Sequence, residues 1–262
     1  MISKTLPRSE IAGHPTIVAG QGRPVLLLHG VGLRAEAWQP QIEALCRTHR
    51  VIAPDMPGHG DTPCPDAPMA IEGYAQALLP VLETLAEPAT LVGHSMGAMI
   101  GLDLANRAPD KVCAVAALNA VFERSSDAVK AVKSRAEALD GVTAPDPTQT
   151  LVRWFGTALS PERAACELWL RNVDPMGYKL AYSAFASAEI PNRQGLTTLH
   201  CPALFMTGAS EPNSTPDMSR KMAELAPKGR SLIVEGAAHM MPMTHAEEVN
   251  AALMQLSDEV WS

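Results

Sequence analysis

Six short apolar runs that alternate with helical patterns constrain the fold of this chain more than any other feature. Each run is rich in Val, Leu and Ile and ends near a turn residue; they are PVLLLHG (24–30), RVIAPD (50–55), ATLVGH (89–94), KVCAVAALN (111–119), PALFMTG (202–208) and SLIVEG (231–236). Such runs suit strands of a parallel sheet that are buried on both faces. The segments between them predict helices over 38–46, 71–86, 96–107, 217–226 and 246–256. The alternation is typical of an α/β protein with a doubly wound, mostly parallel sheet.

One stretch interrupts this rhythm. Between residues 122 and 195 no strand pattern is visible, although the segment contains helix-like pieces and several aromatic residues. A structureless stretch of this length is uncommon in a compact domain, so it predicts a helical insertion over one end of the sheet. The expected organisation is an α/β core formed by residues 1–121 and 196–262, with an inserted helical cap at 122–195.

The composition excludes several functional classes. The net charge is −7 at pH 7 and no basic cluster is present, which argues against a nucleic-acid or anionic-membrane partner. The five cysteines are scattered without a CxxC pair and indicate neither a disulfide framework nor a zinc site. No apolar run has the length of a membrane span, and the first residues lack the apolar core of a signal peptide. We therefore expect a cytoplasmic protein; its oligomeric state is not predicted.

A serine between two glycines follows the third run. The segment LVGHSMGAMIGL (91–102) places Ser95 between Gly93 and Gly97, after a predicted strand and before a predicted helix. In this context G-x-S-x-G is the nucleophile elbow, a strained turn that exposes the serine hydroxyl. The flanking positions are expected to lie too close to neighbouring backbone for side chains. We predict that Ser95 is a nucleophile; the alternative is a capping serine in an ordinary glycine-rich turn.

A nucleophilic serine needs a base, and the chain has eight histidines. His239 follows the last predicted strand in a loop of small residues, at the strand end where parallel sheets collect ligands and catalytic groups. His245 competes, but it lies where the last helix begins and suits a capping or solvated role. His94 is expected to point away from its neighbour on the tight turn, and His59 to hold a loop. His239 is thus the predicted base.

The base in turn needs an acid that orients it. Glu211 lies in the loop after the predicted strand 202–208 and is the carboxylate of that loop before the next helix. The alternative position follows the strand before it, where Asn119 is neutral and cannot stabilise an imidazolium as well. Asp127 lies farther along, inside the insertion. Glu211 is the favoured acid, with a solvated loop carboxylate as the alternative.

The tetrahedral intermediate of acyl transfer needs preorganised hydrogen-bond donors. The backbone N–H of Met96, directly after the serine, is one candidate. The other is expected in LLLHGVGLRAEAW, the segment that includes the loop after the first predicted strand, where Val31 is the favoured donor. His29 is expected to brace this loop.

The chain resembles the α/β-hydrolase superfamily in five motifs and in their order and spacing: LLLHGVG (26–32), VIAPDMPGHGDT (51–62), GHSMGA (93–98), MTGASEPNSTP (206–216) and VEGAAHMMP (234–242). It is similar to the branch of small microbial esterases, lactonases and carbon–carbon hydrolases with a helical cap. The resemblance implies an α/β-hydrolase fold and no metal or organic cofactor. It also implies a triad of Ser95, His239 and Glu211, with Val31 and Met96 at the oxyanion hole. Glu211 departs from the aspartate that most relatives have.

The insertion is expected to decide specificity. Trp154 and Met240 are candidate substrate contacts, although such residues more often pack in a core. Arg153, Arg171 and Arg193 are candidates for binding a substrate carboxylate, since guanidinium groups bind carboxylates in a bidentate manner, with surface solvation as the alternative for each.

The predicted function is hydrolysis of a small-molecule substrate, a carboxylic ester or lactone, through an acyl-enzyme. One alternative is carbon–carbon cleavage of a ring-fission product; relatives of that kind often have asparagine before the serine, where this chain has His94. A second alternative is a hydrolase-like ligand sensor with slow turnover.

Overall fold

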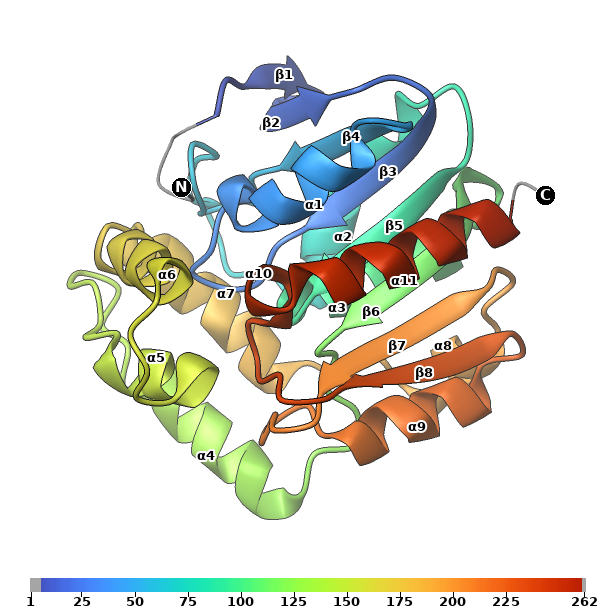
Figure 1. Ribbon diagram of the computed structural model, residues 1–262. Coiled ribbons are helices and arrows are strands. Elements are labelled where there is room, and N and C mark those ends of the chain that lie inside the picture. The colour runs from blue at the N-terminus through green and yellow to red at the C-terminus, as the bar shows by residue number, and fades with distance from the viewer. Residues whose placement is uncertain (1–5, 261–262) are drawn as a thin grey trace.

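An eight-stranded sheet forms the centre of the molecule in this computed structural model, which describes residues 6–260. The first five and last two positions of the predicted core, 1–121 and 196–262, lie outside the described residues. The strand order is β1-β2-β4-β3-β5-β6-β7-β8 (Figure 1). The strands are β1 (Ser9–Ile11), β2 (His14–Ala19), β3 (Arg23–Leu28), β4 (His49–Pro54), β5 (Ala89–His94), β6 (Val112–Leu118), β7 (Ala203–Gly208) and β8 (Gly229–Val234).

The six predicted runs form β3 to β8, each within two residues of its expected bounds, and they pair in parallel. The predicted doubly wound, mostly parallel sheet is therefore confirmed. Strands β1 and β2 were not predicted. They form an antiparallel hairpin whose two-residue turn, Ala12 and Gly13, has positive φ at both positions, and β2 pairs antiparallel with β4.

Helices cover both faces of the sheet. On one face lie α1 (Gln39–Leu45) and α11 (Ala246–Glu259), which are in front of the strands in Figure 1. On the other lie α2 (Ile71–Glu83), α3 (Met96–Arg107) and α9 (Pro216–Leu225). Successive side chains of a strand point to opposite faces, so Leu26 and Leu28 join one core cluster while Val25 and Leu27 join the other. This explains why the central strands read as continuous apolar runs.

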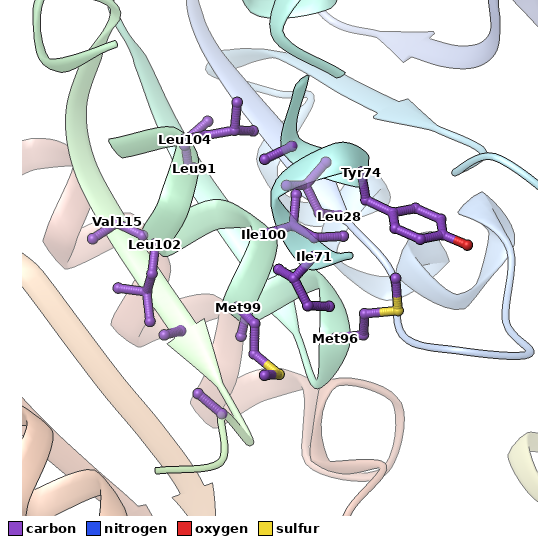
Figure 2. Close-up of a cluster of buried hydrophobic side chains, with 14 of the residues drawn as sticks. Leu28, Ile71, Tyr74, Leu91, Met96, Met99, Ile100, Leu102, Leu104 and Val115 are labelled. Atoms are coloured by element: carbon purple, nitrogen blue, oxygen red, sulfur yellow. The ribbon is translucent and has the colours of Figure 1, made fainter. Parts of the chain in front are cut away.

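Helix α3, which begins directly after Ser95, is anchored in the larger of the two clusters. Figure 2 shows its Met96, Met99, Ile100 and Leu102 among side chains from the neighbouring helix α2 and from strands β3, β5 and β6. All four side chains are at most 2% exposed. The start of α3 is therefore held rigidly against the sheet.

Four helices lie between β6 and α8 (Arg193–Thr197) and occupy the side of the molecule toward which the parallel strands point (Figure 1). They are α4 (Ser126–Glu137), α5 (Thr148–Phe155), α6 (Pro161–Arg171) and α7 (Pro175–Ser187). No strand occurs between residues 119 and 202, all of which the structure describes, as the sequence pattern indicated. Helix α8 contacts α3 and α9. We propose that residues 122–195 form the cap and that the rest of the chain forms the core.

The remaining helices are short: two 3-10 helices, η1 (Ala35–Trp38) and η2 (Pro109–Lys111), and α10 (Met241–Thr244). Across residues 6–260, none of the helices combines the length and the apolar character that crossing a membrane requires.

Candidate active site

Ser95 lies on a strained turn between β5 and α3. Its φ of 56° and ψ of −117° are unfavourable for a residue with a side chain, and its N–H donates to Leu118 O at 2.8 Å. A Cβ atom on Gly93 would collide with the backbone of Gly97, and one on Gly97 would collide with the carbonyl of Leu28. The expected close backbone approach on both sides of the serine is therefore confirmed.

Glu211 and His239 form a hydrogen-bonded pair at the carboxyl ends of β7 and β8. His239 Nδ1 lies 2.9 Å from Glu211 Oε2, and the two residues are 9% and 3% exposed. The other carboxylate oxygen, Oε1, accepts from the backbone N–H groups of Asn213 and Ser214 at 2.7 and 3.3 Å. Burial alone raises the pKa of the Glu211 carboxyl, but the charge and hydrogen bond of His239 and the two N–H groups lower it below its ordinary value. The carboxylate is thus ionised and oriented toward the imidazole.

His94 holds the loop that carries His239. As the sequence predicted, its side chain is directed elsewhere than the serine: its Nε2 donates to the carbonyl of His239 at 2.8 Å, and its ring contacts Trp38 edge-on. Burial lowers the pKa of His94 to about 3, with a further contribution from His239, so the ring is neutral and can serve as this donor. This bracing role was missed, because it depends on a contact between residues 145 positions apart.

The loop after β3 passes directly beside the serine. A Cβ atom on Gly30 would lie 3.2 Å from Ser95 Cβ, and Gly30 and Val31 line the same cavity as Ser95. His29 Nε2 accepts from the N–H of Met56 at 3.0 Å, so its Nδ1 carries the proton and donates to Gly30 O at 2.9 Å. His29 therefore braces the loop, as expected.

Ser95 and His239 line one cavity of about 160 Å³ between the strand ends and the inserted helices. Trp154 on α5 lines this cavity and stacks on the imidazole of His239, with ring centroids 5.3 Å apart and an interplanar angle of 24°. Met240 was expected at the same wall, but its side chain is 1% exposed and belongs to the apolar core cluster. Met96 is also buried in that cluster, so only its backbone N–H is available for the role predicted for it.

The alternative site residues are placed differently. Asn119 lines the cavity, but its side-chain amide donates to Thr207 Oγ1 at 3.1 Å. Asp127 is exposed in the first turn of α4. His245 lies between α10 and α11, where its Nδ1 is 2.9 Å from Thr244 Oγ1. None of the three contacts His239 in the way that Glu211 does.

Three arginines line the cavity: Arg124, Arg135 and Arg153. Arg124 is half-buried over the ring of Phe185, and burial together with the charge of Arg135 lowers its pKa to about 10, so it stays charged at neutral pH. Among residues 6–260, none of the three guanidinium groups forms an ion pair with a carboxylate. These positive charges face the site without an anionic partner from the described chain.

Of the arginines considered from the sequence, only Arg153 lines the cavity. Arg171 pairs with Glu167 at 2.7 Å and Arg193 with Glu123 at 2.6 Å, both at the surface. Arg124, in the loop before α4, and Arg135, on α4, were missed, because nothing in a local pattern shows which parts of the insertion meet the strand ends. Within the described range no group of three or more His, Cys, Asp or Glu side chains is arranged to hold a metal ion.

The fold and this arrangement define a class. A model of the alpha/beta hydrolase family matches residues 25–252, and the chain belongs to that family. Strands β4 to β8, most of β3, the serine turn after β5 and the histidine loop after β8 lie within the matched range, whereas β1 and β2 precede it.

Several individual hydrolases are similar to this chain in sequence or in structure. The chain is 40% identical over 257 residues, 97% of each protein, to (E)-2-((N-methylformamido)methylene)succinate hydrolase of Acinetobacter baylyi. A thermophilic esterase from Thermogutta terrifontis, solved with malate bound, superposes with a TM-score of 0.83 at 25% identity over 94% of this chain and 93% of that one. The enol-lactonase of Burkholderia xenovorans LB400 superposes with a TM-score of 0.82 at 25% identity over 96% of this chain and 100% of that one. The chain is thus similar to a hydrolase of a succinate derivative, to an esterase and to an enol-lactonase.

Proposed function

We propose that this hydrolase is a serine enzyme that forms an acyl-enzyme on Ser95. His239 removes the proton of the serine hydroxyl, and Glu211 orients the imidazole and stabilises its charged form. The observation that carries the proposal is the buried hydrogen bond between His239 Nδ1 and Glu211 at a cavity that Ser95 also lines. A carboxylate partner keeps the proton on Nδ1, which leaves Nε2 free to accept one.

The oxyanion of the tetrahedral intermediate is proposed to accept from the backbone N–H groups of Val31 and Met96. Met96 is the first residue of α3, and the first N–H groups of a helix have no partner within that helix. Val31 follows Gly30, which runs beside Ser95. Both donors are backbone groups of well-packed segments, so they need little reorganisation when charge develops.

The substrate is proposed to be a small carboxylic ester or lactone that carries negative charge. Arg124, Arg135 and Arg153 at the cavity support this, because guanidinium groups that form no ion pair with a carboxylate of the described chain favour a carboxylate ligand. A cavity of about 160 Å³ suits a small acyl compound.

A second candidate substrate is an N-acylated enamine of succinate. The 40% identity over nearly the whole length of the A. baylyi hydrolase favours it, since the name of that enzyme describes such a compound. Malate in the T. terrifontis esterase is also a four-carbon dicarboxylate. Both candidates place an acyl carbon at Ser95 and carboxylates near the arginines.

The test combines active-site labelling with a substrate panel. A fluorophosphonate probe is expected to label the wild type and not Ser95→Ala. On esters and lactones of small dicarboxylic acids and on (E)-2-((N-methylformamido)methylene)succinate, Ser95→Ala is expected to lower kcat by about 10³-fold or more. A Ser95→Ala variant with undiminished turnover on the substrate that the wild type cleaves best would contradict the proposal.

A further inference from the structure

A second cleft adjoins the active-site cavity within the inserted helices. It has a volume of about 200 Å³ and is formed by the end of α4, the following loop, and parts of α5, α6 and α7. Its lining shares five residues with the active-site cavity: Arg135, Thr150, Arg153, Tyr178 and Tyr182. These side chains therefore form a partition with the catalytic cavity on one side and the outer cleft on the other.

Within residues 6–260, the side-chain hydrogen bonds of two charged groups of the partition go to neutral oxygen atoms. Arg135 Nε donates to the hydroxyl of Tyr182 at 3.0 Å, and Arg153 Nη2 donates to Thr150 Oγ1 at 2.9 Å. A guanidinium group binds a carboxylate more strongly than a neutral hydroxyl, because the bond is charge-assisted at both ends and can be bidentate. A carboxylate that reaches Arg135 would therefore compete with Tyr182 for it and loosen the partition.

A local attraction of this kind offsets the charge of the whole chain. A net charge of −7 repels anions at long range. Several arginines elsewhere on the surface are neutralised by acidic neighbours, as Arg107 is by Asp103 and Arg220 by Asp217. The outer cleft contains Arg135, Arg153 and one carboxylate, Asp146, which accepts hydrogen bonds from Thr148 N and Oγ1 at 3.1 and 2.8 Å. The excess of positive groups in the cleft raises the local concentration of an anionic ligand and its rate of association.

We propose that the outer cleft is the route by which an anionic substrate reaches Ser95, and that Arg135 and Arg153 draw its carboxylate through the partition. This inference rests on the proposed hydrolysis at Ser95. It adds a path and two specificity-determining residues that act on association rather than on the chemical step.

The first test compares a charged and a neutral ester with the same leaving group, p-nitrophenyl hydrogen succinate and p-nitrophenyl butyrate. Arg135→Gln and Arg153→Gln are each expected to lower kcat/KM for the charged ester about tenfold at low ionic strength and to weaken its salt dependence. The neutral ester is expected to change less than twofold. Arg220→Gln, on the surface of α9 and outside both cavities, is the matched control and should leave both values unchanged.

The second test fills the cleft. Leu139→Trp adds bulk to a half-buried wall residue of the outer cleft and is expected to reduce kcat/KM for both esters. Leu159→Trp, at a position that is 89% exposed, is the control for an added indole. Melting temperatures of all variants separate blocked access from unfolding.

The outcomes distinguish this inference from the function on which it rests. Ester hydrolysis that persists in Ser95→Ala overturns the proposed function. Ser95-dependent hydrolysis that is indifferent to Leu139→Trp, or that loses the charged and neutral esters equally in Arg135→Gln, overturns the route alone.

Discussion

Two glycines of α3 lie in very different surroundings, although they are separated by a single helical turn. A Cβ atom on Gly97 would collide with backbone oxygen atoms at the end of β3, whereas the nearest atoms to a Cβ on Gly101 would be 4.0 Å away. We expect Gly97→Ala to lower the free energy of unfolding by about 2–3 kcal/mol and to reduce turnover, because overpacking shifts the Ser95 turn. Gly101→Ala should raise stability by about 0.5–1 kcal/mol through helix propensity.

Urea unfolding and steady-state kinetics on both variants check this pair. Because the substitution is the same and the helix is the same, the difference isolates the contact with β3. Equal stability and turnover in the two variants would show that the sheet tolerates a side chain at Gly97.

A second residue-scale prediction concerns Trp154, whose ring stacks on the imidazole of His239. The histidine becomes cationic in the proposed mechanism, and an aromatic face stabilises a nearby cation by about 0.5–2 kcal/mol. Trp154→Leu is therefore expected to lower kcat about 3- to 30-fold, and Trp154→Phe is expected to have a kcat between those of the wild type and Trp154→Leu. Separate measurements of kcat and KM distinguish stabilisation of the imidazolium from substrate binding. A rise in KM with unchanged kcat would show that Trp154 only contacts the substrate, which is the role suggested by the sequence alone.

At the scale of elements, the ion pairs of Arg8 join the start of the chain to the loops after β3 and β4. Its guanidinium lies 2.7 Å from Glu36 Oε2 and 2.7 Å from Asp55 Oδ2, and both carboxylates are buried. Asp55 Oδ1 also accepts from the N–H of Ala35 at 2.9 Å. The network therefore stabilises the segment that follows the proposed oxyanion donor.

Arg8→Met should destabilise the protein by about 3–5 kcal/mol, because it removes the cation that lies 2.7 Å from the buried Asp55 and leaves Glu36 with Arg34 alone. Arg220→Met, which breaks an exposed pair with Asp217, should cost less than about 1 kcal/mol. Urea unfolding compares the two. Similar losses would mean that the buried network contributes no more than a surface pair.

The parallel elements of the fold were predictable because buried strands leave a local signal. The runs that form β3 to β7 contribute apolar side chains to both core clusters, and the edge strand β8 keeps an apolar run although its Leu232 is 38% exposed. The two glycines around Ser95 mark the close backbone approach that follows β5. The hairpin of β1 and β2 lacks that signal: β1 is largely exposed, and its turn is Ala12-Gly13 rather than an asparagine-glycine pair.

The candidate site could be predicted from the sequence only for residues whose positions follow from the strand topology. Parallel strands bring their carboxyl ends together, so the loops after β5, β7 and β8 meet, and Glu211 contacts His239 as the order of motifs implied. Arg124 and Arg135 lie on segments whose position over the sheet depends on helix packing. Their charges read as ordinary surface charges in the sequence, and Met240 reads as a candidate wall residue although it packs in the core.

At the scale of the whole molecule, four buried histidines make stability depend on pH. Burial is the largest cause that lowers the pKa of His29, His49, His59 and His94 from 6.5, to about 3 for the last two. Between pH 6.5 and the lowered values, the unfolded chain binds protons that the folded chain does not. The contribution of these neutral imidazoles to the free energy of unfolding is therefore fully present above pH 6.5 and is lost as the pH drops through this window. Glu36, whose pKa is lowered to about 2, adds a loss in the same direction below pH 4.5.

We expect the free energy of unfolding to be constant from pH 8 to 7 and to fall by about 4 kcal/mol between pH 6.5 and 5. Each proton that the unfolded chain binds and the folded chain does not contributes about 1.4 kcal/mol per pH unit. His49 is the position to test, because it joins β4 to α11 through Ser257 Oγ at 2.8 Å and lies outside the active-site cavity. His49→Asn should reduce the slope by up to one proton while leaving turnover at pH 7.5 unchanged. Urea titrations at half-unit pH steps measure the slope directly. If the free energy of unfolding of the wild type stayed constant down to pH 5, these imidazoles would gain protons in the folded chain without loss of stability. That result would contradict the neutral state inferred for His94.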